Sequence, residues 1–171
     1  MKWVVKKESW PRFIVKSGVV LVLIITAGLA FADRYRIGID RQLVKCIPGY
    51  TFYLIDTKDT ELKRDAIYSF SAEGLEPVYE DGTLMVKYLR GKPGDHVEIS
   101  KEKNVYVNGE YQGYGLKHAE KLGQPEEAFF GEATLGEDSY WFMGTSSESF
   151  DSRYWGTVKH DQIIGRAYPL F

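Results

Sequence analysis

Lys87 is the residue whose surroundings point most directly to chemistry. It lies in the alternating segment Leu84–Leu89, and in a strand it would share one face with Met85 and Leu89. Apolar neighbours disfavour the charged ammonium, and a neutral amine can take a proton from a nucleophile. A hydroxyl or thiol paired with such a lysine forms a Ser/Lys or Cys/Lys dyad. The same short pattern also fits a lysine on the solvent face of an edge strand.

Cys46 is the single cysteine, so the chain has neither an internal disulfide nor a C-x-x-C redox pair. It precedes Pro48-Gly49, where it fits a nucleophile or a small buried hydrophobe before a turn. The net charge of −2 provides no basic excess, which argues against a nucleic-acid partner. We expect no cofactor and no structural zinc, because the histidines do not cluster at ligand spacing: His96, His118 and His160.

The elements that position these residues are expected to be β-strands. Beyond Asp33 the apolar residues mostly alternate, and Asn108-Gly109 predicts a type I′ hairpin turn. Residues 113–138 have no clear period, so we expect a surface excursion with one short helical piece around Leu116–Lys121. The expected strands are Thr51–Ile55, Ala66–Phe70, Leu84–Leu89, His96–Ile99, Asn104–Val107, Tyr140–Met143 and Gln162–Ala167.

An apolar run precedes this β-rich body. Residues Phe13–Ala32, interrupted by Lys16, are long enough as a helix to cross a hydrocarbon core of roughly 30 Å. Ala30-Phe31-Ala32 also fits the end of a cleavable signal peptide, so that alternative stays open. Both interpretations export the remainder of the chain.

The charges around this run favour one orientation. Basic residues dominate the segment 1–12, which favours a cytoplasmic N-terminus, although Arg34, Arg36 and Arg41 follow the run. We therefore expect a cytoplasmic basic segment at 1–12, a transmembrane anchor at 13–32 and an exported β-rich domain at 33–171.

Several segments occur in an order that resembles the signal peptidase I family, particularly its short conjugative-transfer (TraF-type) branch. They are Cys46-Ile47-Pro48-Gly49 before a strand, Lys63-Arg64-Asp65-Ala66-Ile67, Val86–Asp95 with its Pro-Gly-Asp turn, Gly144–Gly156 with the sequence SFDSRYWG, and the closing Ile163–Ala167. The resemblance implies a mainly β fold, a signal-peptidase-like β-barrel or sheet domain preceded by one N-terminal transmembrane helix.

The resemblance also assigns roles. It implies that Lys87 is the general base, that Cys46 occupies the nucleophile position and supplies a backbone oxyanion donor, and that Ser149 orients the lysine amine. The supporting residues of the last segment, an ion pair and a packed serine, are expected to be Asp151, Arg153 and Ser152.

Two positions depart from the family pattern. The family usually has serine where Cys46 stands, and it commonly has a hydroxyl two residues earlier, at Val44. A thiolate is a capable nucleophile, so a Cys/Lys pair is chemically reasonable. Loss of an oxyanion donor can cost around 3 kcal/mol of transition-state stabilisation.

The function implied is that of an endopeptidase in the bacterial inner membrane, with its catalytic domain on the periplasmic side. Its partners would be the lipid bilayer and an exported precursor, which in the TraF-type branch is a pilin. Attack by the precursor's own N-terminus on the acyl-enzyme would yield a cyclic pilin. The alternative is a catalytically defective scaffold or substrate-binding component of a conjugation or secretion apparatus.

Overall fold

The structure is a computed structural model that describes residues 9–59 and 61–171. Most of the expected basic segment, residues 1–8, lies outside the described residues. The chain divides into two compact units, an N-terminal one that ends at Tyr35 and a body, Arg36–Phe171, and each is described by itself.

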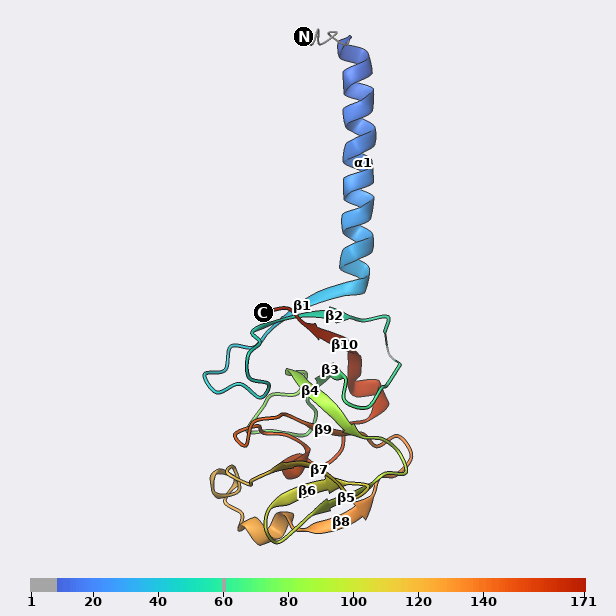
Figure 1. The fold of residues 1–171 in the computed structure, drawn as a ribbon. Coiled ribbons are helices and arrows are strands. Elements are labelled where there is room, and N and C mark those ends of the chain that lie inside the picture. The colour runs from blue at the N-terminus through green and yellow to red at the C-terminus, as the bar shows by residue number, and fades with distance from the viewer. Residues whose placement is uncertain (1–8, 60) are drawn as a thin grey trace, which may run out of the picture. The chain divides into compact units, whose positions relative to one another are not determined.

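The N-terminal unit contains one long helix, α1 (Trp10–Arg34), which includes the whole apolar run (Figure 1). Pro11 lies in the first turn, where its missing N–H removes no helical hydrogen bond. The helix has 25 residues and a mean hydropathy of 2.3 over its most apolar window. Its length and composition suffice to cross a membrane.

The larger sheet of the body contains the strands that surround Lys87. It has six strands in the order β1-β2-β10-β3-β4-β9, and the pairs of β10 with β2 and β3, and of β4 with β3 and β9, are antiparallel. The bounds are β1 (Tyr35–Ile39), β2 (Phe52–Asp56), β3 (Ile67–Ser71), β4 (Leu84–Gly91), β9 (Trp141–Met143) and β10 (Ile163–Pro169).

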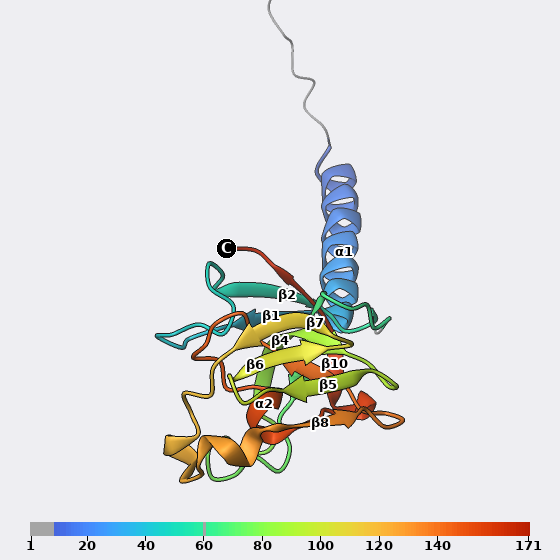
Figure 2. The same cartoon turned by 60° about the horizontal axis from the view of Figure 1, so that its bottom comes forward.

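The smaller sheet has four antiparallel strands in the order β7-β6-β5-β8, and Figure 2 shows β6, β5 and β8 one below another. Asn108 and Gly109 both have positive φ, 51° and 79°, as the expected type I′ turn between β6 and β7 requires. The remaining elements are β5 (His96–Ile99), β6 (Asn104–Val107), β7 (Glu110–Tyr114), β8 (Gly131–Thr134), η1 (Glu120–Leu122), η2 (Glu126–Phe129), α2 (Ser152–Trp155) and η3 (His160–Gln162).

The predicted mainly β fold is confirmed, although β1 is not among the expected strands, and residues 113–138 differ in two ways. Residues 113–138 are not only a surface excursion, because they contain β8, which pairs with β5. The expected helical piece around Leu116–Lys121 is instead a 3₁₀ turn at Glu120–Leu122, followed by a second one at Glu126–Phe129. All four residues of β8 are exposed, so burial leaves no alternating pattern there to read.

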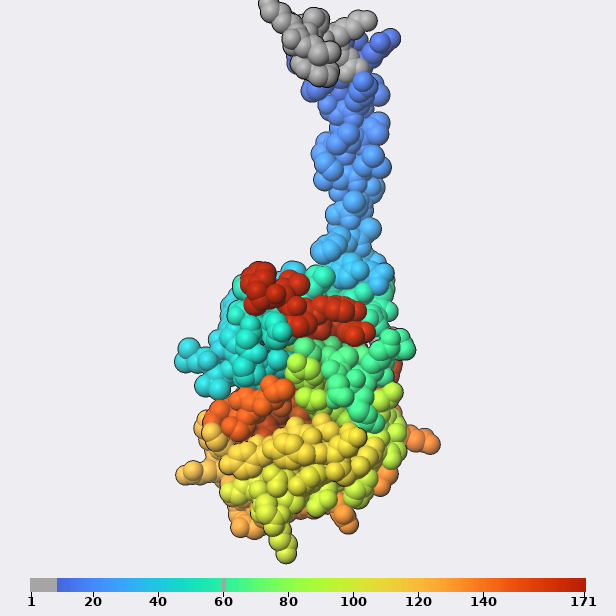
Figure 3. Space-filling view, in the orientation of Figure 1, coloured from blue at the N-terminus to red at the C-terminus, as the bar shows by residue number. Residues whose placement is uncertain are grey.

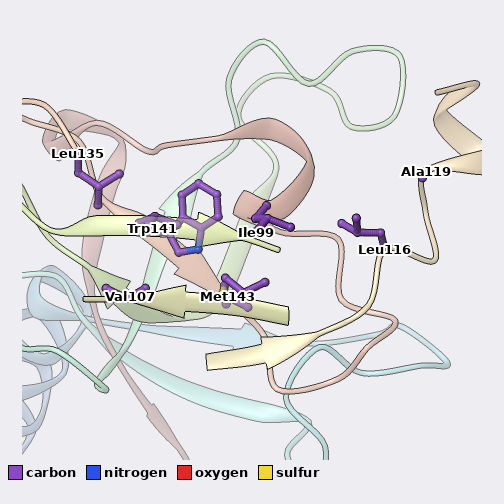
Figure 4. Packing of buried hydrophobic residues seen from close by; sticks show 9 residues of the cluster. Ile99, Val107, Leu116, Ala119, Leu135, Trp141 and Met143 are labelled. Carbon is purple, nitrogen blue, oxygen red and sulfur yellow. The ribbon is translucent and has the colours of Figure 1, made fainter. Parts of the chain in front are cut away.

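Apolar packing joins the two sheets. Trp141 and Met143 of β9 belong to the larger sheet, yet they pack in one cluster with Ile99 and Val107 of the smaller sheet, as Figure 4 shows. A second cluster, around Phe142 and Leu89, fills the opposite side of β9 and β4. Alternate residues of β9 thus face different cores. This fixes the strand beside Lys87 from both sides.

Asp95 connects three segments at the turn between β4 and β5. Its Oδ2 accepts hydrogen bonds from Arg64 Nη2 at 2.7 Å and from the Lys92 N–H at 2.6 Å, and its Oδ1 accepts one from Asn108 Nδ2 at 2.8 Å. Burial works to raise the pKa of Asp95, but the bonds from Lys92, Asn108 and Arg64 outweigh it and lower the pKa below its ordinary value. The carboxylate is therefore a stabilising group at neutral pH.

We expect Asp95→Ala to lower the free energy of unfolding by about 2 kcal/mol at pH 7, because hydrogen bonds to a charged group are lost. A group whose folded-state pKa is lowered stabilises above its ordinary pKa, and this stabilisation disappears as the pH falls through the folded-state value. The difference in unfolding free energy between the variant and the wild type should therefore shrink at acidic pH. Urea unfolding of the protein in detergent measures this difference. Glu137→Ala, which removes an exposed carboxylate, is the control. An equal loss of stability in this variant would contradict the stabilising role of Asp95.

Candidate active site

Lys87 is a buried lysine on the fifth of the six strands of the larger sheet. It lies on β4, opposite Tyr68 of β3, and is only 3% exposed. Met85 and Leu89 flank it on the same face and are also buried. Its Nζ donates a hydrogen bond to Ser149 Oγ at 3.0 Å. The amine thus has an apolar environment and one polar side-chain partner, which are the conditions under which a lysine can act as a base.

Ser149 belongs to a loop that a buried ion pair holds. Arg153 Nε and Nη2 donate to Asp151 Oδ1 and Oδ2, each at 2.8 Å, which is bidentate geometry. Arg153 Nη2 also donates to the Ser149 carbonyl at 3.0 Å, and Asp151 Oδ2 accepts from the Gly144 N–H at 3.0 Å. Asp151 and Arg153 are 0% and 3% exposed. The pair therefore ties both ends of the loop that carries Ser149.

The guanidinium of Arg153 reaches beyond this loop. Its Nη1 donates to the carbonyls of Tyr114 and Gly115, at the end of β7, at 3.0 and 2.9 Å. Burial works to lower the pKa of Arg153, but the hydrogen bonds and charge of Asp151 raise it above its ordinary value. Ser152 Oγ accepts from the Phe142 N–H at 2.9 Å, which attaches α2 to β9. Ser152 thus holds the start of α2 to β9 through a hydrogen bond.

Cys46 lies in the loop between β1 and β2, and it is 7% exposed. Its carbonyl accepts hydrogen bonds from the N–H groups of Thr145 and Ser146 at 2.9 and 3.3 Å, which fastens it to the loop of Ser149. A Cβ added at Gly144 would overlap both the Cys46 carbonyl oxygen and Ser149 Oγ. Glycine at 144 is therefore what lets the segments of Cys46 and Ser149 meet.

These two segments are neighbours at the surface as well. In Figure 3 the cyan surface of the residues around 45 borders the orange surface of the residues around 148, in agreement with the hydrogen bonds to the Cys46 carbonyl. A cavity of about 270 Å³ opens beside them, and both Cys46 and Lys87 line it. Its wall is mainly apolar, with Ile37, Ile55 and Val86 among the lining residues.

The resting contacts of the two candidate residues are separate. Among residues 9–59 and 61–171, no hydrogen bond joins Lys87 Nζ to Cys46 Sγ; the amine donates to Ser149 and the thiol donates to Gln42 Oε1 at 3.3 Å. Both groups nevertheless line the same cavity. Val44 is 57% exposed and adds no polar atom to the site.

Sequence reasoning missed several polar residues of the cavity, and three of them matter most for its chemistry. Gln42 and Tyr79 line it and are joined by a hydrogen bond from Gln42 Nε2 to Tyr79 Oη at 3.3 Å. Ser69 Oγ also belongs to the lining, and it is buried without a partner among the described residues. Gln42 and Tyr79 lie in irregular segments, where no periodicity marks a residue as facing a site.

Comparison with known proteins identifies related chains. The family model described as "Signal peptidase, peptidase S26" matches residues 11–171. The probable signal peptidase I-2 of Synechocystis sp. is 33% identical over 87 residues, which cover 50% of this chain and 37% of that protein. Signal peptidase I of Pseudomonas aeruginosa is 31% identical over 120 residues, with 50% of this chain and 42% of that protein covered. This chain thus spans about two fifths of the length of these relatives.

A solved structure is also similar. The crystal structure of a signal peptidase I from Enterococcus faecalis aligns with a TM-score of 0.40 and 25% sequence identity, over 62% of this chain and 96% of that chain.

Proposed function

Because this chain belongs to the peptidase S26 family of signal peptidases, we propose that it is a membrane-anchored endopeptidase that cleaves exported precursor proteins. The observation that carries the proposal is the buried amine of Lys87, held by Ser149 in a cavity that it shares with the only thiol of the chain. We place α1 in the bacterial inner membrane as a single-pass anchor, with residues 33–171 as the catalytic domain on the periplasmic side.

Cys46 is the nucleophile and Lys87 the general base of this peptidase. Lys87 Nζ, as the neutral amine, takes the thiol proton while the sulfur attacks the scissile carbonyl carbon. The carbon–nitrogen bond then breaks, and the ammonium of Lys87 returns the proton to the leaving amine. Ser149 aims the amine, and Asp151 and Arg153 keep Ser149 in place. The result is a thioester between Cys46 and the precursor.

The substrate is expected to bind as an extended strand. β9 pairs with β4 at Tyr88, Leu89 and Gly91, so the part of β4 before Tyr88 has an edge without β9 next to the cavity. A precursor segment can add to such an edge through main-chain hydrogen bonds, and alternate side chains then point into the cavity. The cavity of about 270 Å³ has room for such side chains.

A conjugative pilin is the precursor that we propose, on the resemblance to the TraF-type branch. The thioester suits a second outcome besides hydrolysis, since amines compete well with water for thioesters. If the N-terminal amine of the precursor attacks the thioester carbonyl, the thiol leaves with a proton and the product is a cyclic chain. Cys46 and Lys87 would then both cleave the precursor and cyclise it.

The test is precursor processing by the full-length protein in detergent. We expect the wild type to cleave and Cys46→Ala to lose at least about 10³-fold in rate, because the nucleophile is gone. Mass spectrometry of the mature pilin tests the second step, since a cyclic product weighs one water less than the linear chain. Unchanged processing by Cys46→Ala would eliminate the dyad. A wild type that binds the precursor without cleaving it would instead support the defective scaffold, which the absent hydroxyl at Val44 favours.

A further inference from the structure

An attacked carbonyl needs hydrogen-bond donors for the negative charge that develops on its oxygen. The Cys46 N–H makes no hydrogen bond within residues 9–59 and 61–171, so it is available as one donor. Val44, where the family commonly has a hydroxyl, carries an apolar and exposed side chain. A second donor in this chain would have to come from a different residue.

The carboxamide of Gln42 is in direct contact with the sulfur. Cys46 Sγ donates to Gln42 Oε1 at 3.3 Å, and Gln42 lines the cavity that Cys46 and Lys87 share. In a tetrahedral intermediate the oxyanion lies two bonds from the sulfur. A group that touches the sulfur is therefore also within reach of the oxyanion.

Gln42 is held in this position from two sides. Its N–H donates to Asp40 Oδ1 at 3.0 Å, and its Nε2 donates to Tyr79 Oη at 3.3 Å. The ring of Tyr79 packs against Phe150, with the ring centroids 5.7 Å apart, and Phe150 directly follows Ser149. The loop that aims the lysine amine thus also supports the partner of Gln42.

The pair of Gln42 and Tyr79 can reverse its hydrogen bonds. In the resting state Gln42 Oε1 accepts from the thiol and Nε2 donates to Tyr79. A hydroxyl both donates and accepts, so after a half turn of the carboxamide Tyr79 can donate to Oε1 while Nε2 points at the sulfur. Burial raises the pKa of Tyr79, and the neighbouring Cys46 raises it further. The hydroxyl of Tyr79 therefore keeps its proton at neutral pH. The reversal therefore loses no hydrogen bond.

From these contacts we infer that Gln42 is a further catalytic residue, which orients the Cys46 thiol before attack and donates from Nε2 to the oxyanion after it. The inference rests on the proposed function. As the sulfur–carbon bond forms, the carbonyl π electrons move to oxygen and the thiol proton moves to Lys87. The amide of Gln42 and the N–H of Cys46 then share the negative charge. When the leaving amine departs with the proton from Lys87, the carbonyl is restored as the thioester.

The test compares Gln42→Glu with the wild type in the precursor-cleavage assay. The glutamate has the same shape and can accept but cannot donate, so we expect kcat to fall about 100-fold, as for loss of one oxyanion donor. KM should change less than about threefold, because the donor acts in the transition state. Tyr79→Phe should give a smaller loss of kcat, since the amide remains but is no longer held. Gln124→Glu, an exposed glutamine in the loop before η2, is the charge-matched control and should retain full activity.

The role of Gln42 and the proposed function fail under different results. A Gln42→Glu variant with wild-type kcat, or with only a raised KM, would overturn the role of Gln42 while Cys46→Ala still reports on the dyad. Cleavage that survives Cys46→Ala would overturn the proposed function itself. A thermal unfolding midpoint equal to that of the wild type excludes a folding defect as the cause of lost activity in Gln42→Glu.

Discussion

Replacement of Lys87 by methionine is expected to abolish precursor cleavage and to leave the fold intact. The side chain is 3% exposed, with Met85 and Leu89 on its own face, so an apolar chain of similar length fits the site. Removal of the general base should lower kcat by about 10⁴-fold, the upper end of the range for such a group. Unfolding in urea should show a stability within about 2 kcal/mol of the wild type, because removal of a buried amine offsets the lost partner of Ser149 Oγ. Steady-state kinetics and urea unfolding of the full-length protein in detergent measure both effects.

The matched control is Lys92→Met, just beyond the end of β4. Lys92 Nζ donates to the Leu62 carbonyl at 2.9 Å and does not line the cavity. We expect its kcat to stay within about threefold of the wild type, as for a residue remote from the chemistry. A Lys87→Met variant that keeps a tenth of the wild-type rate would contradict the assignment of the base.

Arg153→Met is expected to give the largest loss of stability. It leaves the carboxylate of Asp151 buried without its partner, and removal of one member of a buried pair costs about 3–5 kcal/mol. It also frees the carbonyls of Tyr114, Gly115 and Ser149, which Arg153 now satisfies. Cleavage should fall with stability, because the position of Ser149 depends on the same contacts. Arg153→Lys should recover little, since an ammonium cannot reproduce the bidentate geometry.

Chemical unfolding of the purified variants in detergent measures this loss. Arg166→Met is the control, because Arg166 is 3.7 Å from Asp59 and both side chains of that pair are partly exposed. An exposed pair contributes about 0–1 kcal/mol, so we expect a correspondingly small effect. Equal losses of stability in the two variants would mean that Arg153 does not hold the loop of Ser149 in place.

The strands that could be predicted from the sequence are those with at least one buried face. In His96–Ile99 and Asn104–Val107, buried residues alternate with partly buried or exposed ones, and the predicted bounds equal the observed ones. Gly131–Thr134 could not be predicted, because all its residues are exposed and its pairing with β5 involves the backbone. Periodicity reports burial, so a strand whose residues are all exposed leaves little trace in the sequence pattern.

The same distinction applies to the site. The positions of Lys87 and Ser149 follow from segments that resemble a family pattern, although they are far apart in the sequence. The contacts of Gln42 depend on where two irregular loops meet, since its partner Tyr79 lies 37 residues later. Neither loop has a period or a motif that would predict the contact between Gln42 and Tyr79. Such residues emerge only when the tertiary arrangement is known.

The central claim is that Cys46 forms a covalent bond with the precursor. Acid quenching of a single-turnover reaction, followed by intact-mass and peptide mass spectrometry, tests it most directly. We predict an adduct on Cys46 with the mass of the acyl fragment. Neutral hydroxylamine should remove it, as it removes a thioester, and it should be absent when Lys87→Met is mixed with the same precursor. Precursor cleavage at the wild-type rate with Cys46 alkylated, and with no adduct at any time, would contradict it.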